Sequence, residues 1–241
     1  MATGDRPSGL PAGARATELS SSGGIDAFLR EAREIVPGGE GARLIFALDA
    51  TMSRQPTWDL ACQVQAEMFG AVATLGGMQV QLVYFRGFRE CRASRWVGDA
   101  RSLGDLMARI GCRAGQTQIG RVLAHVEGEA RRSALRAFVY VGDAVEEPID
   151  RLAEVAGRLG LLGVKAFAFH EGGDPSAAAA FGEIARLTGG AALRFDHRAP
   201  ASLADLLRAA AAYAGGGRAA LERLAHTNGE ARRLIAGMHS A

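Results

Sequence analysis

The unbroken apolar run at residues 44–48 constrains the fold more than any other feature of the sequence. A run of this length between turn residues is typical of a strand buried on both faces, as in a parallel sheet. Asp49, Thr51 and Ser53 follow at alternate positions and would lie at the carboxyl end of that strand. Open α/β sheets bind their ligands at this edge. Carboxylate and hydroxyl oxygens suit a hard cation such as Mg²⁺, so the stretch predicts a metal site used for binding.

Strand patterns alternate with helix patterns along most of the chain. The expected strands are residues 43–48, 80–85, 91–96, 137–141, 164–169 and 191–195. The expected helices are residues 26–36, 56–74, 102–110, 119–131, 148–159, 176–187, 202–213 and 219–236. This alternation predicts an α/β fold with a doubly wound, mostly parallel sheet and helices on both faces. Only a brief turn precedes residues 91–96, so we expect them to form one antiparallel edge strand.

Two of these strands run directly into an aspartate, one at Asp49 and the other at Asp143. Right-handed crossovers place the strand-end loops of a parallel sheet along one edge. We therefore expect the strands that end near Leu48 and Val141 to be neighbours or near neighbours in the centre of the sheet.

Composition and charge argue against several classes of protein. The 241 residues carry a formal net charge of +2, and no basic stripe is interleaved with aromatic residues, so nucleic-acid binding is not indicated. The three cysteines and five histidines show no disulfide or metal-ligand spacing. Neither a secretory signal nor a membrane span is recognisable. We expect a cytoplasmic protein with no nucleic-acid or membrane partner.

The ends of the chain differ in composition from its middle. Residues 1–24 are rich in Gly, Ser, Ala and Pro, and we expect them to form a disordered tail. Residues 25–214 are expected to form the α/β domain, and three glycines at 215–217 then interrupt the chain. Residues 218–238 are expected to form a C-terminal amphipathic helix. Its apolar stripe leaves two alternatives: packing on its own domain, or docking on another chain or a second copy.

Three separated segments together resemble a known family. Residues 49–53, Asp-Ala-Thr-Met-Ser, resemble the Asp-x-Ser-x-Ser signature of von Willebrand factor A (VWA) domains, with Thr in place of the first Ser. Residues 115–119 resemble the family's Gly-Gly-Thr segment, and residues 141–143 resemble the strand that ends in its second Asp. The segments occur in the family's order, and the resemblance covers nearly the whole domain. It is closest to the intracellular bacterial type.

The resemblance implies a metal-ion-dependent adhesion site. Its ligands would be Asp49, Thr51, Ser53, Thr117 and Asp143, holding Mg²⁺ or Mn²⁺. The last coordination position would be left for an Asp or Glu of a protein partner, which makes the chain a metal-dependent protein-interaction module. By the same likeness, bacterial members often serve in multiprotein complexes, in some cases beside AAA+ ATPases.

Other interpretations of the same residues stay open. Asp49 and Asp143 could simply cap helices, as Asp often does after a strand. A Mg²⁺-dependent phosphoester hydrolase of the same architecture is the alternative function, because haloacid dehalogenase-type enzymes also place an Asp after their first strand. Those enzymes need a second Asp two residues later, where this chain has Thr51, and no general base or phosphate loop is recognisable. We therefore do not expect an enzyme. A third alternative is an assembly subunit acting through the C-terminal helix.

Three features around the predicted site also have two interpretations each. Residues 170–174 lie at the expected ligand edge, where they either border the site or form a plain Gly-rich loop. Gly142 precedes Asp143, in the reverse of the family's frequent order, so we expect backbone freedom just before Asp143. The arginines at 86, 89, 92 and 95 are expected to protect a sheet edge, the alternative being a patch for an acidic partner.

Overall fold

The structure is a computed structural model, and it describes residues 41–55, 77–195 and 200–238. The N-terminal tail and the helices expected at 26–36 and 56–74 lie outside these residues, so those expectations stay predictions. Among the described residues, no helix is long and apolar enough to cross a membrane.

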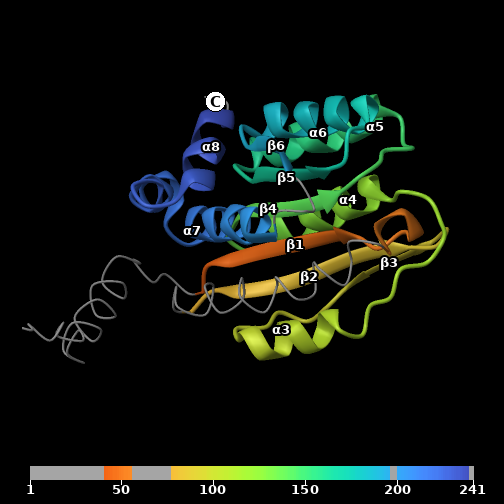
Figure 1. The fold of residues 1–241 in the computed structure, drawn as a ribbon, viewed down its shortest axis with the longest axis horizontal. Helices are drawn as coiled ribbons and strands as arrows, with labels where there is room; N and C mark the ends of the chain where they lie inside the picture. Colours follow the sequence, from red (N-terminus) through yellow and green to blue (C-terminus); the bar gives the residue numbers. More distant parts are fainter. Residues whose placement is uncertain (1–40, 56–76, 196–199, 239–241) are drawn as a thin grey trace, which may run out of the picture.

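The described part of the chain forms a six-stranded sheet in the order β3-β2-β1-β4-β5-β6. Its strands are β1 (Arg43–Asp49), β2 (Gln79–Arg86), β3 (Glu90–Ala93), β4 (Leu135–Gly142), β5 (Lys165–Glu171) and β6 (Ala191–Phe195). All neighbouring pairs are parallel except β2 and β3, which are antiparallel. Figure 1 shows β1 between β2 and β4 in the middle of the sheet. The mostly parallel sheet, its antiparallel edge strand and the central pairing of β1 with β4 are thus confirmed.

Helices cover both faces of the sheet and enclose two hydrophobic clusters. The helices are α3 (Ala100–Met107), α4 (Ile119–Ala130), α5 (Ile149–Leu161), α6 (Pro175–Thr188), α7 (Pro200–Ala225) and α8 (Gly229–Gly237). Side chains of α3, α7 and α8 join one cluster, and those of α4, α5 and α6 join the other. The doubly wound architecture is therefore confirmed.

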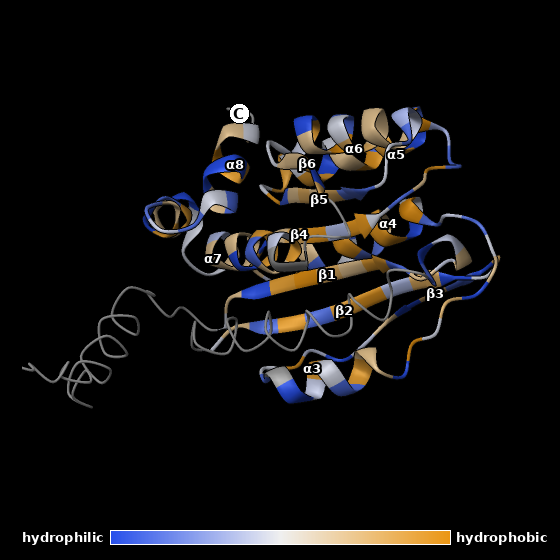
Figure 2. Ribbon diagram, viewed as in Figure 1, coloured by the Kyte–Doolittle hydropathy of each residue, from blue (hydrophilic) through white to orange (hydrophobic). Residues whose placement is uncertain are grey.

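Burial on both faces explains why β1 is apolar without interruption. Phe46 packs in the cluster under α7, whereas Ile45 and Ala47 pack in the opposite cluster under α4. Each fully buried side chain of this kind stabilises the fold by roughly 1.5–3 kcal/mol. Figure 2 shows the result, with hydrophobic central strands between helices that carry hydrophilic residues.

The C-terminal segment differs from the single helix expected over residues 218–238. Helix α7 is interrupted at Gly216 and Gly217, as the three glycines predicted, but the chain then turns again before α8. Asn228 causes this second break, because its side chain accepts a hydrogen bond from the Ala231 N–H at 2.8 Å and caps a new helix. Leu221 and Leu234 are fully buried in the cluster that also covers β1. Both pieces therefore pack on the domain that precedes them.

Candidate metal site

The candidate site lies at the topological switch point of the sheet. From β1 the chain moves to β2 on one side, whereas β4 lies on the other side of β1, and open α/β sheets bind ligands where the strand order reverses in this way. Leu48 pairs with Val141, which puts Asp49 level with Gly142 and one residue short of Asp143. The sequence-predicted aspartates are thus brought to adjacent strand ends.

Hydrogen bonds fix the loop that follows β1. The Ala50 N–H donates to the Phe85 carbonyl, and the Ala50 carbonyl accepts from Arg113 N–H, both at 3.0 Å. Asp49 Oδ1 accepts from the Thr51 N–H at 2.8 Å. The hydroxyl oxygens of Thr51 and Ser53 lie 3.1 Å apart, at the start of the 3₁₀ helix η1 (Met52–Arg54). Three of the five predicted ligands therefore share one tightly bonded turn.

Thr117 reaches the same edge from the loop before α4, and it is tied to the loop that follows Asp143. Its N–H donates to Glu146 Oε2 at 2.8 Å, while its hydroxyl oxygen accepts from the Glu146 N–H at 2.9 Å. Glu147 accepts from the Ile119 and Gly120 N–H groups at the start of α4. A hydroxyl oxygen has two lone pairs, so Thr117 keeps one for a further partner. The sequence analysis missed both glutamates, although acidic residues are favoured near a helix N-terminus.

A close backbone approach positions the Thr117 loop. A Cβ atom on Gly115 would lie 2.0 Å from the Gly87 carbonyl oxygen, so only glycine fits there. The same carbonyl accepts from the Gln116 N–H at 3.2 Å and from the Gln118 side chain at 3.2 Å. The tip of the β2–β3 hairpin is thus a support for the loop that carries Thr117.

Two carboxylate oxygens of the site are buried and lack a hydrogen-bond partner among the described residues: Asp49 Oδ2 and Asp143 Oδ1. Burial, helped by the nearby charge of Asp143, raises the pKa of Asp49 to about 6, although hydrogen bonds from Thr51 and the charge of Arg54 act against it. Buried acceptors of this kind are costly unless a cation or donor meets them. The oxygens of the site therefore fit a hard divalent cation.

The fit depends on hydroxyl groups as well as carboxylates. Within the described ranges, no cluster of three or more His, Cys, Asp or Glu side chains is placed to hold a metal ion. The candidate set instead combines two carboxylates with the hydroxyls of Thr51, Ser53 and Thr117. Such a set favours the oxygen-seeking Mg²⁺ or Mn²⁺ over zinc, which is bound mostly by nitrogen and sulfur ligands.

Helix capping does not explain either aspartate in the part of the chain that the structure describes. Asp99 and Asp174 do cap helices, accepting from Ser102 N–H and Ser176 N–H at 2.7 Å each. By contrast, neither η1 nor α5 has a side-chain cap, and the acceptor at the start of α4 is Glu147, so neither aspartate caps any of these described helices. Asp174 is therefore a helix cap, and it supplies a natural comparison for Asp49.

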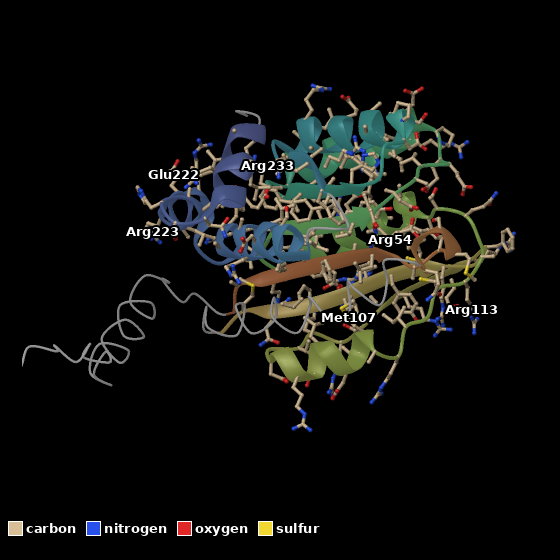
Figure 3. The ribbon with its side chains drawn as sticks, in the orientation of Figure 1. Arg54, Met107, Arg113, Glu222, Arg223 and Arg233 are labelled. Atoms are coloured by element: carbon tan, nitrogen blue, oxygen red, sulfur yellow. The ribbon has the colours of Figure 1, made fainter. Side chains whose placement is uncertain are left out.

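An ion pair that the sequence analysis missed lies beside the two aspartates. Arg54 directly follows the predicted ligand Ser53, yet it is 1% exposed and pairs with Glu171 at the end of β5. Burial lowers the pKa of Arg54 from its ordinary value, while the carboxylates of Asp49 and Asp143 act in the opposite direction. Figure 3 shows Arg54 near the ends of β1 and β4, whereas the labelled Arg223 lies at the periphery. Residues 170–174 thus border the site through Glu171.

Gly142 has a different role from the one expected. Its φ is not positive, so the chain does not need glycine there for backbone freedom. A Cβ atom would instead lie 2.5 Å from the hydroxyl oxygen of Tyr140, whose ring is buried below the site. Glycine is required at this position by the close approach of that ring.

Comparison with solved structures identifies the fold. No protein-family model and no curated protein matches the chain in sequence. Solved structures do match: a von Willebrand factor type A protein from Catenulispora acidiphila has 18% identity and a TM-score of 0.59, over 75% of this chain and 44% of the other. The VWA domain of SpRpn10 has 10% identity and a TM-score of 0.56, over 67% of this chain and 94% of that domain. The fold is that of a VWA domain.

A third match extends the range of proteins that share this fold. Proximal thread matrix protein 1 from the mussel byssus has 15% identity and a TM-score of 0.54, over 73% of this chain and 47% of the other. The chain thus spans less than half of the Catenulispora and mussel proteins. At these identities the matches establish the architecture alone.

Proposed function

We propose that the chain is a divalent-cation-dependent protein-interaction module that captures an acidic side chain of a partner. One observation carries the proposal: Asp49 Oδ2 and Asp143 Oδ1 are buried without hydrogen-bond partners in the described structure, at the switch point of a VWA fold. The resemblance to the adhesion site of VWA domains supplies the same five residues. Mg²⁺ or Mn²⁺ is the expected cation.

Each predicted ligand has a distinct part in holding the cation. Asp49 and Asp143 would balance its charge, and the neutral hydroxyls of Thr51, Ser53 and Thr117 would complete the oxygen set without adding negative charge. A bound cation would supply positive charge and an exchangeable coordination position for a partner's carboxylate. Because Thr117 is bonded to Glu146, the loops before α4 and after β4 would respond together when the site is filled.

The surface around the site suits a partner with acidic and apolar groups. Met52 is 50% exposed between two predicted ligands, and Phe88 is 73% exposed at the hairpin tip that supports the Thr117 loop. Glu90 pairs with Arg92 on the same hairpin and with Arg113 of the loop before α4, and both arginines keep most of their surface exposed. Positive charge beside an apolar rim favours an acidic segment. By the family resemblance, such a segment would belong to a multiprotein complex, in which an AAA+ ATPase is one candidate partner.

Thermal unfolding with and without metal tests the cation. At a metal concentration about 100 times the dissociation constant, binding stabilises the folded state by about 2.7 kcal/mol, so the midpoint should rise by roughly 5–10 °C. Asp49→Ala should abolish this response. Asp174→Ala should keep it, because that carboxylate only caps a helix on the same edge. A wild-type midpoint that is unmoved by Mg²⁺ and Mn²⁺ would overturn the proposed function.

Selection from a displayed peptide library tests the partner chemistry. With Mg²⁺ present, the wild type should enrich peptides that contain Asp or Glu, and chelation by EDTA should release them. Asp49→Ala should enrich no such peptides. Enrichment that is equal with and without metal would show that capture does not use the cation.

A further inference from the structure

Arg54 places a permanent positive charge against the carboxylates that would hold the cation. Its side chain is buried, it pairs with Glu171, and Asp49 and Asp143 are the charged groups that act on it most strongly after burial itself. Arginine stays protonated at every physiological pH, so this charge cannot be removed by titration. A divalent cation that enters the site must therefore bind beside the positive charge of Arg54.

We propose that the buried Arg54–Glu171 pair sets the metal affinity of the site, with Arg54 opposing the divalent cation and Glu171 supporting it. This inference rests on the proposed function, because it concerns the same site. It adds a residue pair that lies outside the five predicted ligands and acts on the cation through charge.

The charges of the four side chains are consistent with this division. With all groups ionised, Asp49, Asp143 and Glu171 carry three negative charges, and Arg54 returns one positive charge. The remaining two negative charges match one divalent cation. Without the cation, the guanidinium is the only positive group among these four side chains, so it partly neutralises the aspartates. Glu171 gives the guanidinium a carboxylate partner outside the predicted ligand set, and its negative charge lowers the repulsion that an entering cation meets.

The two partners of the ion pair should therefore have opposite effects on metal binding. Removing the charge of Arg54 removes a like charge from the neighbourhood of the cation, and affinity should rise by roughly tenfold or more. Removing the charge of Glu171 leaves the guanidinium to the two aspartates, and affinity should fall by a similar factor. A pair with a purely structural role would act differently, because breaking it from either side would disturb the site in the same direction.

Mn²⁺ binding, measured by the loss of the free-ion electron paramagnetic resonance signal, tests the proposal on the full chain. Arg54→Met should bind Mn²⁺ more tightly than the wild type, whereas Arg54→Lys, which keeps the charge, should bind as the wild type does. Glu171→Gln should bind more weakly. Arg158→Met is the matched control, because it breaks a surface pair with Glu127 away from the site and should leave Mn²⁺ affinity unchanged.

The double variant Arg54→Met with Glu171→Gln keeps the proposal testable if Arg54→Met alone misfolds. It leaves neither partner of the ion pair buried without the other, and replacing both partners of a buried ion pair is often tolerated. Its Mn²⁺ affinity should exceed that of Glu171→Gln alone and return close to the wild-type value. This comparison holds even if Arg54→Met alone does not fold.

The outcomes separate this proposal from the proposed function. If the wild type binds Mn²⁺ through Asp49 but Arg54→Met and Glu171→Gln change affinity in the same direction or not at all, the role of the ion pair is overturned and the metal site stands. The charge mechanism is also overturned if Arg54→Lys binds as tightly as Arg54→Met. If neither the wild type nor Arg54→Met binds Mn²⁺, both proposals fail.

Discussion

Asp49 is the residue at which stability and the proposed function conflict. Its carboxylate is 0% exposed, and one of its oxygens has no hydrogen-bond partner among the described residues. A protein without need of a ligand here would gain stability from a neutral side chain of the same shape. Such conflicts between local stability and function are typical of functional sites.

The first prediction follows from the raised pKa of Asp49. The pKa is about 6 in the folded state against an ordinary value of 3.8, so the folded state holds the proton more tightly. Between these values the unfolding free energy must fall as pH rises, because the carboxylate ionises less readily in the folded protein. Asp49→Asn lacks this loss. In EDTA, the unfolding free energy of Asp49→Asn relative to that of the wild type should increase between pH 4 and pH 7, by at most about 3 kcal/mol.

Urea unfolding of the two proteins at pH 4 and pH 7 measures this difference. At each pH, the unfolding free energy of the wild type is subtracted from that of the variant. This removes the contributions of the other carboxylates, several of which have pKa values lowered by surface arginines. A difference that stays the same at both pH values would contradict the account of Asp49.

At the scale of the elements, the hairpin between β2 and β3 supports the ligand loop through a close backbone contact and through hydrogen bonds to the Gly87 carbonyl. The backbone of Gly115 lies against Gly87, and Thr117 follows two residues later. Gly115→Ala should force these backbones apart and lower stability by roughly 1–3 kcal/mol, as overpacking does. It should also weaken Mn²⁺ binding, because the Thr117 hydroxyl moves with its loop.

Gly111→Ala is the matched control for this prediction. A Cβ atom at Gly111 would meet nothing within 4 Å, so stability should change by less than about 0.5 kcal/mol and Mn²⁺ binding should be unchanged. Urea unfolding and Mn²⁺ titration of the two variants make the comparison. Equal effects of the two substitutions would show that the hairpin contact does not position the loop.

The last helix, α8, provides the second prediction at this scale. Leu234 is fully buried against the rest of the domain, and the backbone of neighbouring Gly237 lies close to Ala191 and Leu193 of β6. Leu234→Ala should cost about 2–5 kcal/mol of unfolding free energy. Leu161→Ala makes the same change in a helix where the side chain is 91% exposed, and it should cost less than about 0.5 kcal/mol. If Leu234→Ala is equally harmless, α8 is a docking element for another chain.

The elements could be predicted from the sequence where the signal is local. The apolar run of β1 and the glycines at 216 and 217 each report on their own neighbourhood, and the structure agrees with both. The break at Asn228 was missed, although Asn-Gly is a turn signal, because an amphipathic pattern continued across it. Local patterns therefore locate elements well, but they fail to locate a boundary where a turn signal competes with a continuing helix pattern.

The buried surroundings of the site could not be predicted in the same way. The position of Arg54 depends on Glu171, which comes from a strand distant in the sequence, and a charged residue beside hydroxyls ordinarily lies at the surface. Glu146 and Glu147 likewise act through loops that only the folded sheet brings together. Asp49, Thr51 and Ser53 could be predicted from their place after an apolar strand, whereas the full set of five ligands came from the family resemblance. The joint role of the five as metal ligands stays a prediction.

At the scale of the whole molecule, the fold explains why these residues meet. The strand order changes direction between β1 and β4, so the loops that carry Asp49 and Asp143 open beside one another, and the hairpin and α4 bring Thr117 to the same edge. The matches with VWA structures establish this architecture, whereas the function depends on the side chains that this chain places on it.

The most direct test of the central claim is anomalous X-ray scattering from crystals of the protein grown with Mn²⁺. The account predicts a manganese peak between Asp49 and Asp143, with the hydroxyl oxygens of Thr51, Ser53 and Thr117 around it. Crystals of Asp49→Ala grown under the same conditions should lack that peak. Crystals of the wild type with no peak at this edge of the sheet, at a Mn²⁺ concentration that fills other oxygen sites, would contradict the account.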